Sequence, residues 1–149
     1  MGAQPWYYFM PYDSAIETAF RALREREFLA GRYYPAVSSL KFPIDSSSPS
    51  PGAKHTSIEA AIGSAGPNGT RSILDITNVQ LAGPRRPGAI VPLTRDELIE
   101  LYGSDKPSRE MVQANMDFFI DLDRGEGIFA ILYAAGKPNE ILFAGYSYD

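Results

Sequence analysis

Apolar residues recur at helical spacing in four segments, and each segment opens on a residue that can cap a helix. In the first, Ser14-x-x-Glu17 forms a capping box, and Gly31 follows Ala30. The apolar positions of this segment are Ile16, Ala19, Phe20 and Leu23. Spacings of three and four place them on one side of a helix, so the pattern predicts a helix from Ser14 to about Ala30.

The other three helical segments show the same signals. Thr56-x-x-Glu59 and Thr94-x-x-Glu97 are further capping boxes, and glycine ends the segments that follow them. Ser108 caps the last segment, whose apolar residues include Met111, Ala114, Phe118 and Leu122. This broad apolar stripe predicts a largely buried helix.

Five segments have the pattern of strands. They are Trp6–Tyr12, Ser72–Thr77, the short Ala89–Pro92, Gly127–Ala135 and Glu140–Tyr148. Both faces of Ile128–Tyr133 are apolar, which predicts a central strand covered on both sides. Gly136–Asn139 joins the last two strands as a hairpin.

The order of these elements predicts an α+β fold, because it lacks strict alternation of strand and helix. We expect one domain over residues 1–149, with a mixed or antiparallel sheet of about four to five strands and three to four helices. A long loop around residues 36–56 holds the Ser/Pro-rich run Ser46–Gly52, and a loop of this length is functional or mobile. Before that run, Leu40, Phe42 and Ile44 alternate with other residues, which predicts a short edge strand.

The amino-acid composition limits the kinds of catalytic and metal site that the chain can form. The chain has 149 residues, no cysteine and one histidine, His55, which lies in the long loop. Disulfides and thiolate metal sites are therefore excluded, and no catalytic residue, metal ligand or cofactor is assigned. Gly125–Ala130 has the letters of a dinucleotide fingerprint, but a helix precedes it and a strand follows, which is the reverse of what that motif needs. Asp121–Gly125 resembles the start of a calcium loop but is followed by Glu126, where that loop needs glycine.

Charge and hydropathy bear on partners and location. The net charge is −4 and the pI about 5.0, which disfavours nucleic acid as a partner. The first residues, Met1–Trp6, contain no lysine or arginine and so make a poor secretory signal. The apolar run Ile128–Ala135 is too short to cross a membrane. We therefore expect a cytoplasmic protein with no membrane partner.

Two groups of side chains are candidate binding residues. The first is an acidic patch of Asp117, Asp121, Asp123 and Glu126, at a predicted helix C-terminus where the dipole disfavours negative charge. It is either a solvated face or a recognition patch for a basic protein. The second group is aromatic, with Arg32 beside it, and consists of Trp6, Tyr7, Tyr8, Tyr12, Tyr33 and Tyr34. Such residues form binding hot spots, but they also pack in sheets.

Asp75 interrupts the apolar run Ile73–Ile76. If it is buried it needs a partner such as Arg71; if it lines a cleft, its pKa rises and it can act as a base. The leading hypothesis is an acidic protein-binding module, such as an immunity or antitoxin-like inhibitor of a partner protein. The alternative is a small enzyme or small-molecule-binding domain, whose tyrosine-lined pocket uses Asp75 and an arginine, Arg71 or Arg32. A homo-oligomer that pairs edge strands is a third reading.

Overall fold

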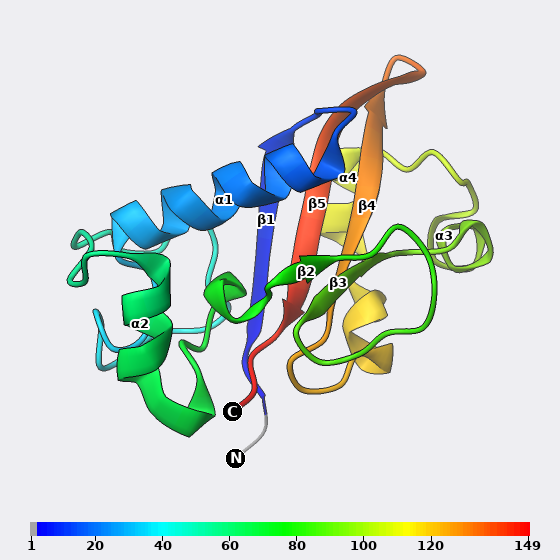
Figure 1. The fold of residues 1–149 in the computed structure, drawn as a ribbon. Coiled ribbons are helices and arrows are strands. Elements are labelled where there is room, and N and C mark those ends of the chain that lie inside the picture. The colour runs from blue at the N-terminus through cyan, green and yellow to red at the C-terminus, as the bar shows by residue number, and fades with distance from the viewer. Residues whose placement is uncertain (1–2) are drawn as a thin grey trace.

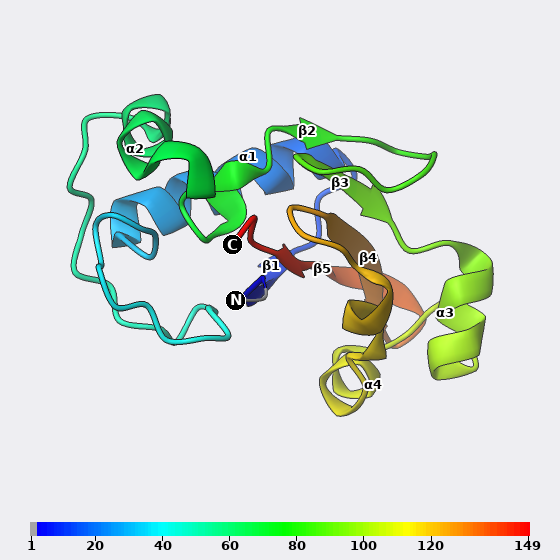
Figure 2. The same ribbon diagram turned by 90° about the horizontal axis from the view of Figure 1, so that it is seen from below.

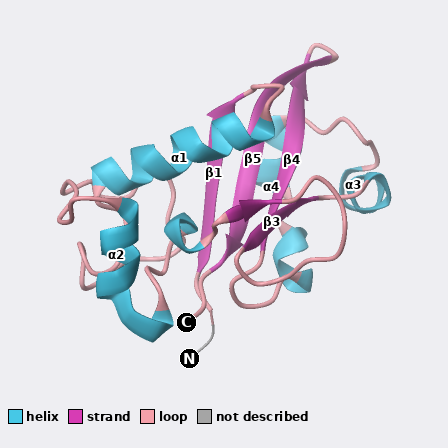
Figure 3. Cartoon of the chain, viewed as in Figure 1, coloured by secondary structure: helices cyan, strands magenta, loops and turns pink. Residues whose placement is uncertain are grey.

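A mixed five-stranded sheet runs through the middle of the computed structural model, which describes residues 3–149 (Figures 1 and 3). The strands are β1 (Pro5–Pro11), β2 (Asn78–Val79), β3 (Ala89–Pro92), β4 (Gly127–Ala134) and β5 (Lys137–Tyr146). Their order in the sheet is β1-β5-β4-β3-β2. β5 is antiparallel to both β1 and β4, whereas β3 is parallel to β4 and β2 is parallel to β3. Met1 and Gly2, at the start of the segment tested as a secretory signal, lie outside the described residues.

Helices cover both faces of this sheet, which confirms the α+β class (Figure 2). The α-helices are α1 (Ile16–Ala30), α2 (Ile58–Ala65), α3 (Arg95–Tyr102) and α4 (Arg109–Ala114). Three short 3-10 helices are η1 (Gly66–Asn68), η2 (Ile73–Asp75) and η3 (Asp117–Asp121). α1 crosses one face, while α4 and η3 lie against the opposite face. Within residues 3–149, no helix is both long and apolar enough to traverse a bilayer.

Alternation along β1 divides its aromatic residues between two cores. Trp6 and Tyr8 are buried on the α1 side, together with Leu23 of that helix. Tyr7 and Phe9 point to the other side and pack against the cluster that contains Val112, Phe118 and Leu132. β4 lies between β5 and β3 with both faces covered, so the predicted central strand is confirmed.

The helix boundaries confirm one capping box and correct two. Thr94 and Glu97 form the complete reciprocal box at the start of α3. At α1 the N-cap position is Ala15 rather than Ser14; no side chain caps the helix there, and Asp13 accepts a hydrogen bond from Ala15 N–H. At α2 the cap is Ser57 rather than Thr56. Neighbouring Ser, Thr and Asp residues compete for this role, so a capping pattern identifies a helix better than its first residue.

Two segments that were predicted to be strands, Ser72–Thr77 and Leu40–Ile44, are not strands of the sheet. Ser72–Thr77 is not a strand: the Ser72 hydroxyl accepts a hydrogen bond from Leu74 N–H, and the chain turns into η2. The segment Leu40–Ile44 forms only an isolated bridge between Ile44 and Trp6. In both segments apolar residues are buried in the core although the backbone does not form a strand of the sheet.

The last helix is also shorter than predicted. α4 ends at Ala114, and Asn115 adopts extended backbone angles. Its side chain accepts a hydrogen bond from Asp117 N–H and donates one to the Leu101 carbonyl, which diverts the chain into η3. The predicted apolar stripe thus continues over two separate elements.

Candidate functional site

The aromatic candidates do not form one surface. Trp6, Tyr8 and Tyr33 are buried, so they serve packing in the isolated chain. Tyr7 and Tyr34 are half-buried, and Tyr12 is exposed at the far end of β1. Because alternate residues of β1 face opposite cores, a shared aromatic face is excluded by the pleat of the strand.

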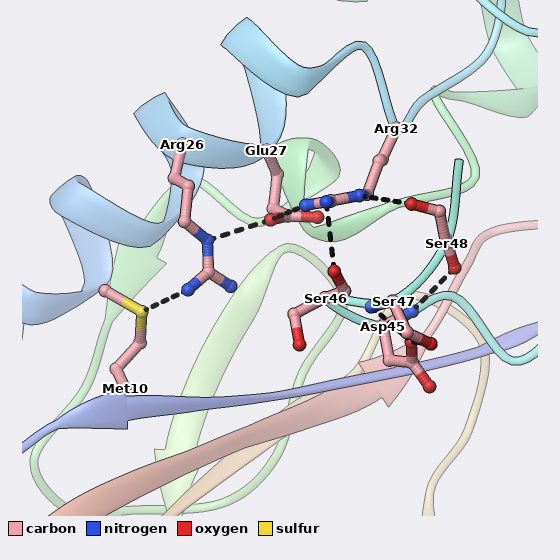
Figure 4. A network of polar contacts seen from close by, with 8 residues as sticks. All are labelled: Met10, Arg26, Glu27, Arg32, Asp45, Ser46, Ser47 and Ser48. Atoms are coloured by element: carbon pink, nitrogen blue, oxygen red, sulfur yellow. Dashed lines mark hydrogen bonds and ion pairs between the residues drawn. The ribbon is translucent and has the colours of Figure 1, made fainter. Parts of the chain in front are cut away.

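Arg32 belongs to a buried ionic network that the sequence analysis did not identify (Figure 4). Its partner is Glu27, which is 0 % exposed, at a distance of 2.8 Å between Arg32 Nη1 and Glu27 Oε2. Arg26 donates to the same oxygen at 3.0 Å. The nitrogens of Arg32 that do not bind Glu27 donate to the carbonyls of Ser46 and Ser48. Arg32 therefore neutralises a buried carboxylate and holds the Ser/Pro-rich loop against α1.

Asp75 stabilises a turn of the backbone through hydrogen bonds with Thr70. Its side chain is buried, and Oδ1 accepts two hydrogen bonds of 2.8 Å from the backbone N–H and hydroxyl of Thr70. Burial raises the pKa of Asp75, although the hydrogen bonds from Thr70 act in the opposite direction. Among the described residues no ion pair joins it to Arg71, whose guanidinium lies over the Tyr34 ring and 3.8 Å from Asp149. Asp75 thus organises the turn at residues 69–72 rather than facing open solvent.

Two of the acidic candidates, unlike the aromatic ones, lie together at the surface. Asp117 and Asp121 line one cavity of about 280 Å³, between α3 and η3. We call this cavity the acidic groove. It is lined by Glu97, Glu100, Leu101, Asn115, Asp117, Phe118, Ile120 and Asp121. Two of its four carboxylates, Glu97 and Glu100, come from α3. Neither was among the candidate binding residues, and Glu97 was expected only to cap the helix.

Hydrogen bonds hold the walls of the acidic groove in place. Asn115 Nδ2 donates to the Leu101 carbonyl at 3.1 Å, and the Tyr102 hydroxyl donates to the Asn115 carbonyl at 2.7 Å. Phe118 is buried in the core beneath η3. These contacts join α3 to the segment that carries Asp117, so the carboxylates are held near one another by a rigid frame.

The electrostatics of the acidic groove are unbalanced. Arg85 forms an ion pair of 2.5 Å with Glu97. Burial opposes the ionisation of Glu97, but hydrogen bonds from Thr94 N–H and Arg85 outweigh it and lower its pKa. No ion pair among the described residues involves Glu100, Asp117 or Asp121. Three exposed carboxylates of the groove therefore have no cationic partner within residues 3–149.

The charge of Asp117 acts on its surroundings. Burial, together with the nearby carboxylate of Asp117, raises the pKa of Tyr102 to about 12. The phenol therefore stays neutral at physiological pH and keeps its hydrogen bond to Asn115. A neutral phenol neither adds to nor offsets the charge of the carboxylates in the groove.

An exposed apolar side chain lies at the edge of the acidic groove. Ile120 is 78 % exposed, more than any other large apolar residue among those described. It lines the groove and also a second hollow of about 350 Å³, whose lining includes Phe119, Leu122 and Tyr146. A lone exposed isoleucine is unremarkable, but one between two hollows is suited to contact a partner.

The other two acidic candidates, Asp123 and Glu126, do not line the acidic groove. Asp123 lines the second hollow rather than the groove. Glu126 is buried, and its Oε1 accepts a hydrogen bond from Asp123 N–H, so it caps a turn and is not part of an exposed patch. The missed residues Glu97 and Glu100 were visible in the sequence as acids three positions apart on one helix. Nothing in the sequence placed that helix beside Asp117.

No three His, Cys, Asp or Glu side chains within residues 3–149 are placed to hold a metal ion. Comparison of the chain with protein-family models, with curated proteins and with solved structures finds no match. Its function is therefore inferred from its own surfaces. Of these, the acidic groove combines a cavity, carboxylates that form no ion pair with a described residue, and an exposed apolar side chain.

Proposed function

We propose that this chain is a protein-binding module that holds a basic segment of a partner protein in the acidic groove. The observation that carries the proposal is the placement of Glu100, Asp117 and Asp121 in one cavity, where none of them forms an ion pair with a described residue. Complementary charge accelerates association and selects the partner, and the exposed side chain of Ile120 supplies apolar area beside it. The partner is accordingly a protein that presents lysine or arginine next to an apolar side chain.

The test compares two variants that each lose three negative charges. The groove variant carries Glu100→Gln, Asp117→Asn and Asp121→Asn. The control variant carries Glu25→Gln, Glu59→Gln and Glu110→Gln, all at exposed positions outside the groove. Each tagged protein is used to capture partners from lysate of the native host at low and moderate salt, and captured proteins are identified by mass spectrometry.

We expect a basic protein to be captured by the wild type and by the control variant but not by the groove variant. Its capture falls as salt rises, because exposed charges are screened. Ile120→Ser, at an exposed position, weakens capture without lowering stability. Equal capture by the groove and control variants contradicts the proposal, because net charge alone then explains the binding.

A synthetic peptide of lysine and leucine at helical spacing provides a direct measurement. Amide NMR shifts of the wild type are expected to move around the acidic groove, and affinity is expected to fall about tenfold or more in the groove variant. Inhibition of the captured partner, as for an immunity or antitoxin-like protein, is a further proposal. If the partner is an enzyme, its activity with and without this chain decides that point.

A further inference from the structure

The Ser/Pro-rich loop, expected to be functional or mobile, is held at both ends. At one end, Arg32 donates to the Ser48 carbonyl at 2.9 Å and to the Ser46 carbonyl at 3.0 Å (Figure 4). At the other end, Gly52 N–H donates to the Ala30 carbonyl at 2.9 Å. Because Arg32 is itself paired with buried Glu27, the loop is tied to the core rather than to another surface group.

This tethering shapes a small cavity, which we call the loop pocket. Its volume is about 110 Å³, and it is lined by Arg32, Val37, Ser39, Leu40, Lys41, Ser48 and Pro49. Most of the surface area that lines the pocket is apolar. Leu40, at the pocket, also packs against the main core. An enclosed apolar cavity of about 150 Å³ accepts benzene. The loop pocket is smaller but opens to solvent, so it suits one ring or a short branched chain that stays partly exposed.

Of the two cations that border the loop pocket, Arg32 and Lys41, only Arg32 has a charged partner among the described residues. Lys41 is exposed and forms no ion pair with any described residue. The nitrogens of Arg32 are already engaged by Glu27, Ser46 and Ser48. The charge available to a ligand is therefore the ammonium group of Lys41.

We propose that the loop pocket binds a small carboxylate whose ring or short branched chain enters the cavity and whose anionic group pairs with Lys41. A shallow hollow lined by Ala36, Ser38, Ser50 and Pro51 shares Val37 and Pro49 with the pocket. It offers room for a longer ligand to extend along the loop. Figures 1 and 2 both place this loop away from α3, so the site is separate from the acidic groove.

Benzoate and its neutral counterpart benzamide test the proposal by NMR titration of the wild type. We expect millimolar binding of both, with amide shifts confined to residues around the pocket, and tighter binding of benzoate. Lys41→Met weakens benzoate binding about two- to fivefold and leaves benzamide unchanged, as for an exposed ion pair. Lys54→Met, at an exposed lysine of the same loop outside the pocket lining, leaves both unchanged.

Two variants that block the cavity complete the test. Val37→Phe fills the pocket from within, and Ser39→Phe does so from an exposed position where folding is not at risk. Loss of benzoate binding in Ser39→Phe, and in Val37→Phe where that variant folds, supports the proposal. Binding that persists in Ser39→Phe, no shift around the pocket at high millimolar benzoate, or equal weakening by Lys41→Met and Lys54→Met overturns it.

Discussion

The hydroxyl of Tyr33 lies 2.8 Å from Nδ1 of His55 and connects the protein core to the end of the long loop. Lys54 N–H donates to the same hydroxyl oxygen at 3.2 Å. The phenol oxygen therefore accepts one hydrogen bond from the backbone and forms a second with Nδ1, in which the tautomer of the ring sets the donor. Tyr33 is fully buried and stacks on Phe28, so the histidine that looked isolated in the sequence has a buried partner.

Tyr33→Phe is expected to lower the free energy of unfolding by about 1–2 kcal/mol, because it leaves Lys54 N–H and His55 Nδ1 without their partner. Urea unfolding measures the change. Tyr12→Phe is the control, since Tyr12 is exposed. A Tyr33→Phe variant as stable as the wild type would show that water replaces both hydrogen bonds.

Arg32→Met is expected to cost about 3–5 kcal/mol, because Glu27 then stays buried with one of its two cationic partners missing. Arg26→Met should cost less, since Arg26 is 37 % exposed and Arg32 only 12 %. Guanidinium unfolding gives the stabilities, and limited proteolysis reports release of the loop at Ser46–Ser48. Equal losses in the two variants would contradict this ranking.

Asp75 and Asp45 are expected to affect the pH dependence of stability with opposite signs. Burial raises the pKa of Asp75 in the folded protein. Its contribution to stability is therefore fully present below the unfolded-state pKa of about 3.9 and is lost as pH rises through the folded value. From pH 3 to 7, the wild type should lose stability relative to Asp75→Asn.

At Asp45, partial burial opposes ionisation, but hydrogen bonds from Ser47 and Tyr7 outweigh it and lower the pKa. Its contribution is present above the unfolded-state pKa and is lost as pH falls through the folded value. The wild type should therefore gain stability relative to Asp45→Asn over the same range. Urea unfolding at several pH values measures both pairs, and parallel curves for the two variants would refute the assignment.

Gly31→Ala is expected to be more destabilising than Gly136→Ala. Both glycines have φ near +75°, which costs an alanine about 1–2 kcal/mol. At Gly31 the added Cβ would also overlap the carbonyl oxygen of Gly52, whereas at Gly136 no atom of the described residues lies within 4 Å of it. The clash adds about 1–3 kcal/mol, and thermal unfolding of the two variants measures the difference. Equal melting temperatures would show that the loop moves freely away from Gly31.

Local patterns predicted the elements that depend on local interactions. Thr94 and Glu97 lie on one turn of helix, and the capping box they predicted is present. Gly31 ends α1 where expected, because the residue after the helix adopts the left-handed conformation that glycine accepts without strain. The central position of β4 followed from its two apolar faces. Asp117 and Asp121, two members of the predicted acidic patch, line one cavity and lie on a 3-10 helix.

The sequence by itself determined the α+β class, four of the strands, the helix-rich segments and the absence of thiol chemistry. Each follows from the spacing or type of neighbouring residues. Only the tertiary structure decided that Glu97 and Glu100 face Asp117, that Arg32 neutralises Glu27, and that Trp6 and Tyr8 are buried. Glu100 and Asp117 belong to different elements that meet only in the folded chain. Arg32 and Glu27 are five residues apart, but they pair because Glu27 is buried, and burial is set by the whole core rather than by a local pattern.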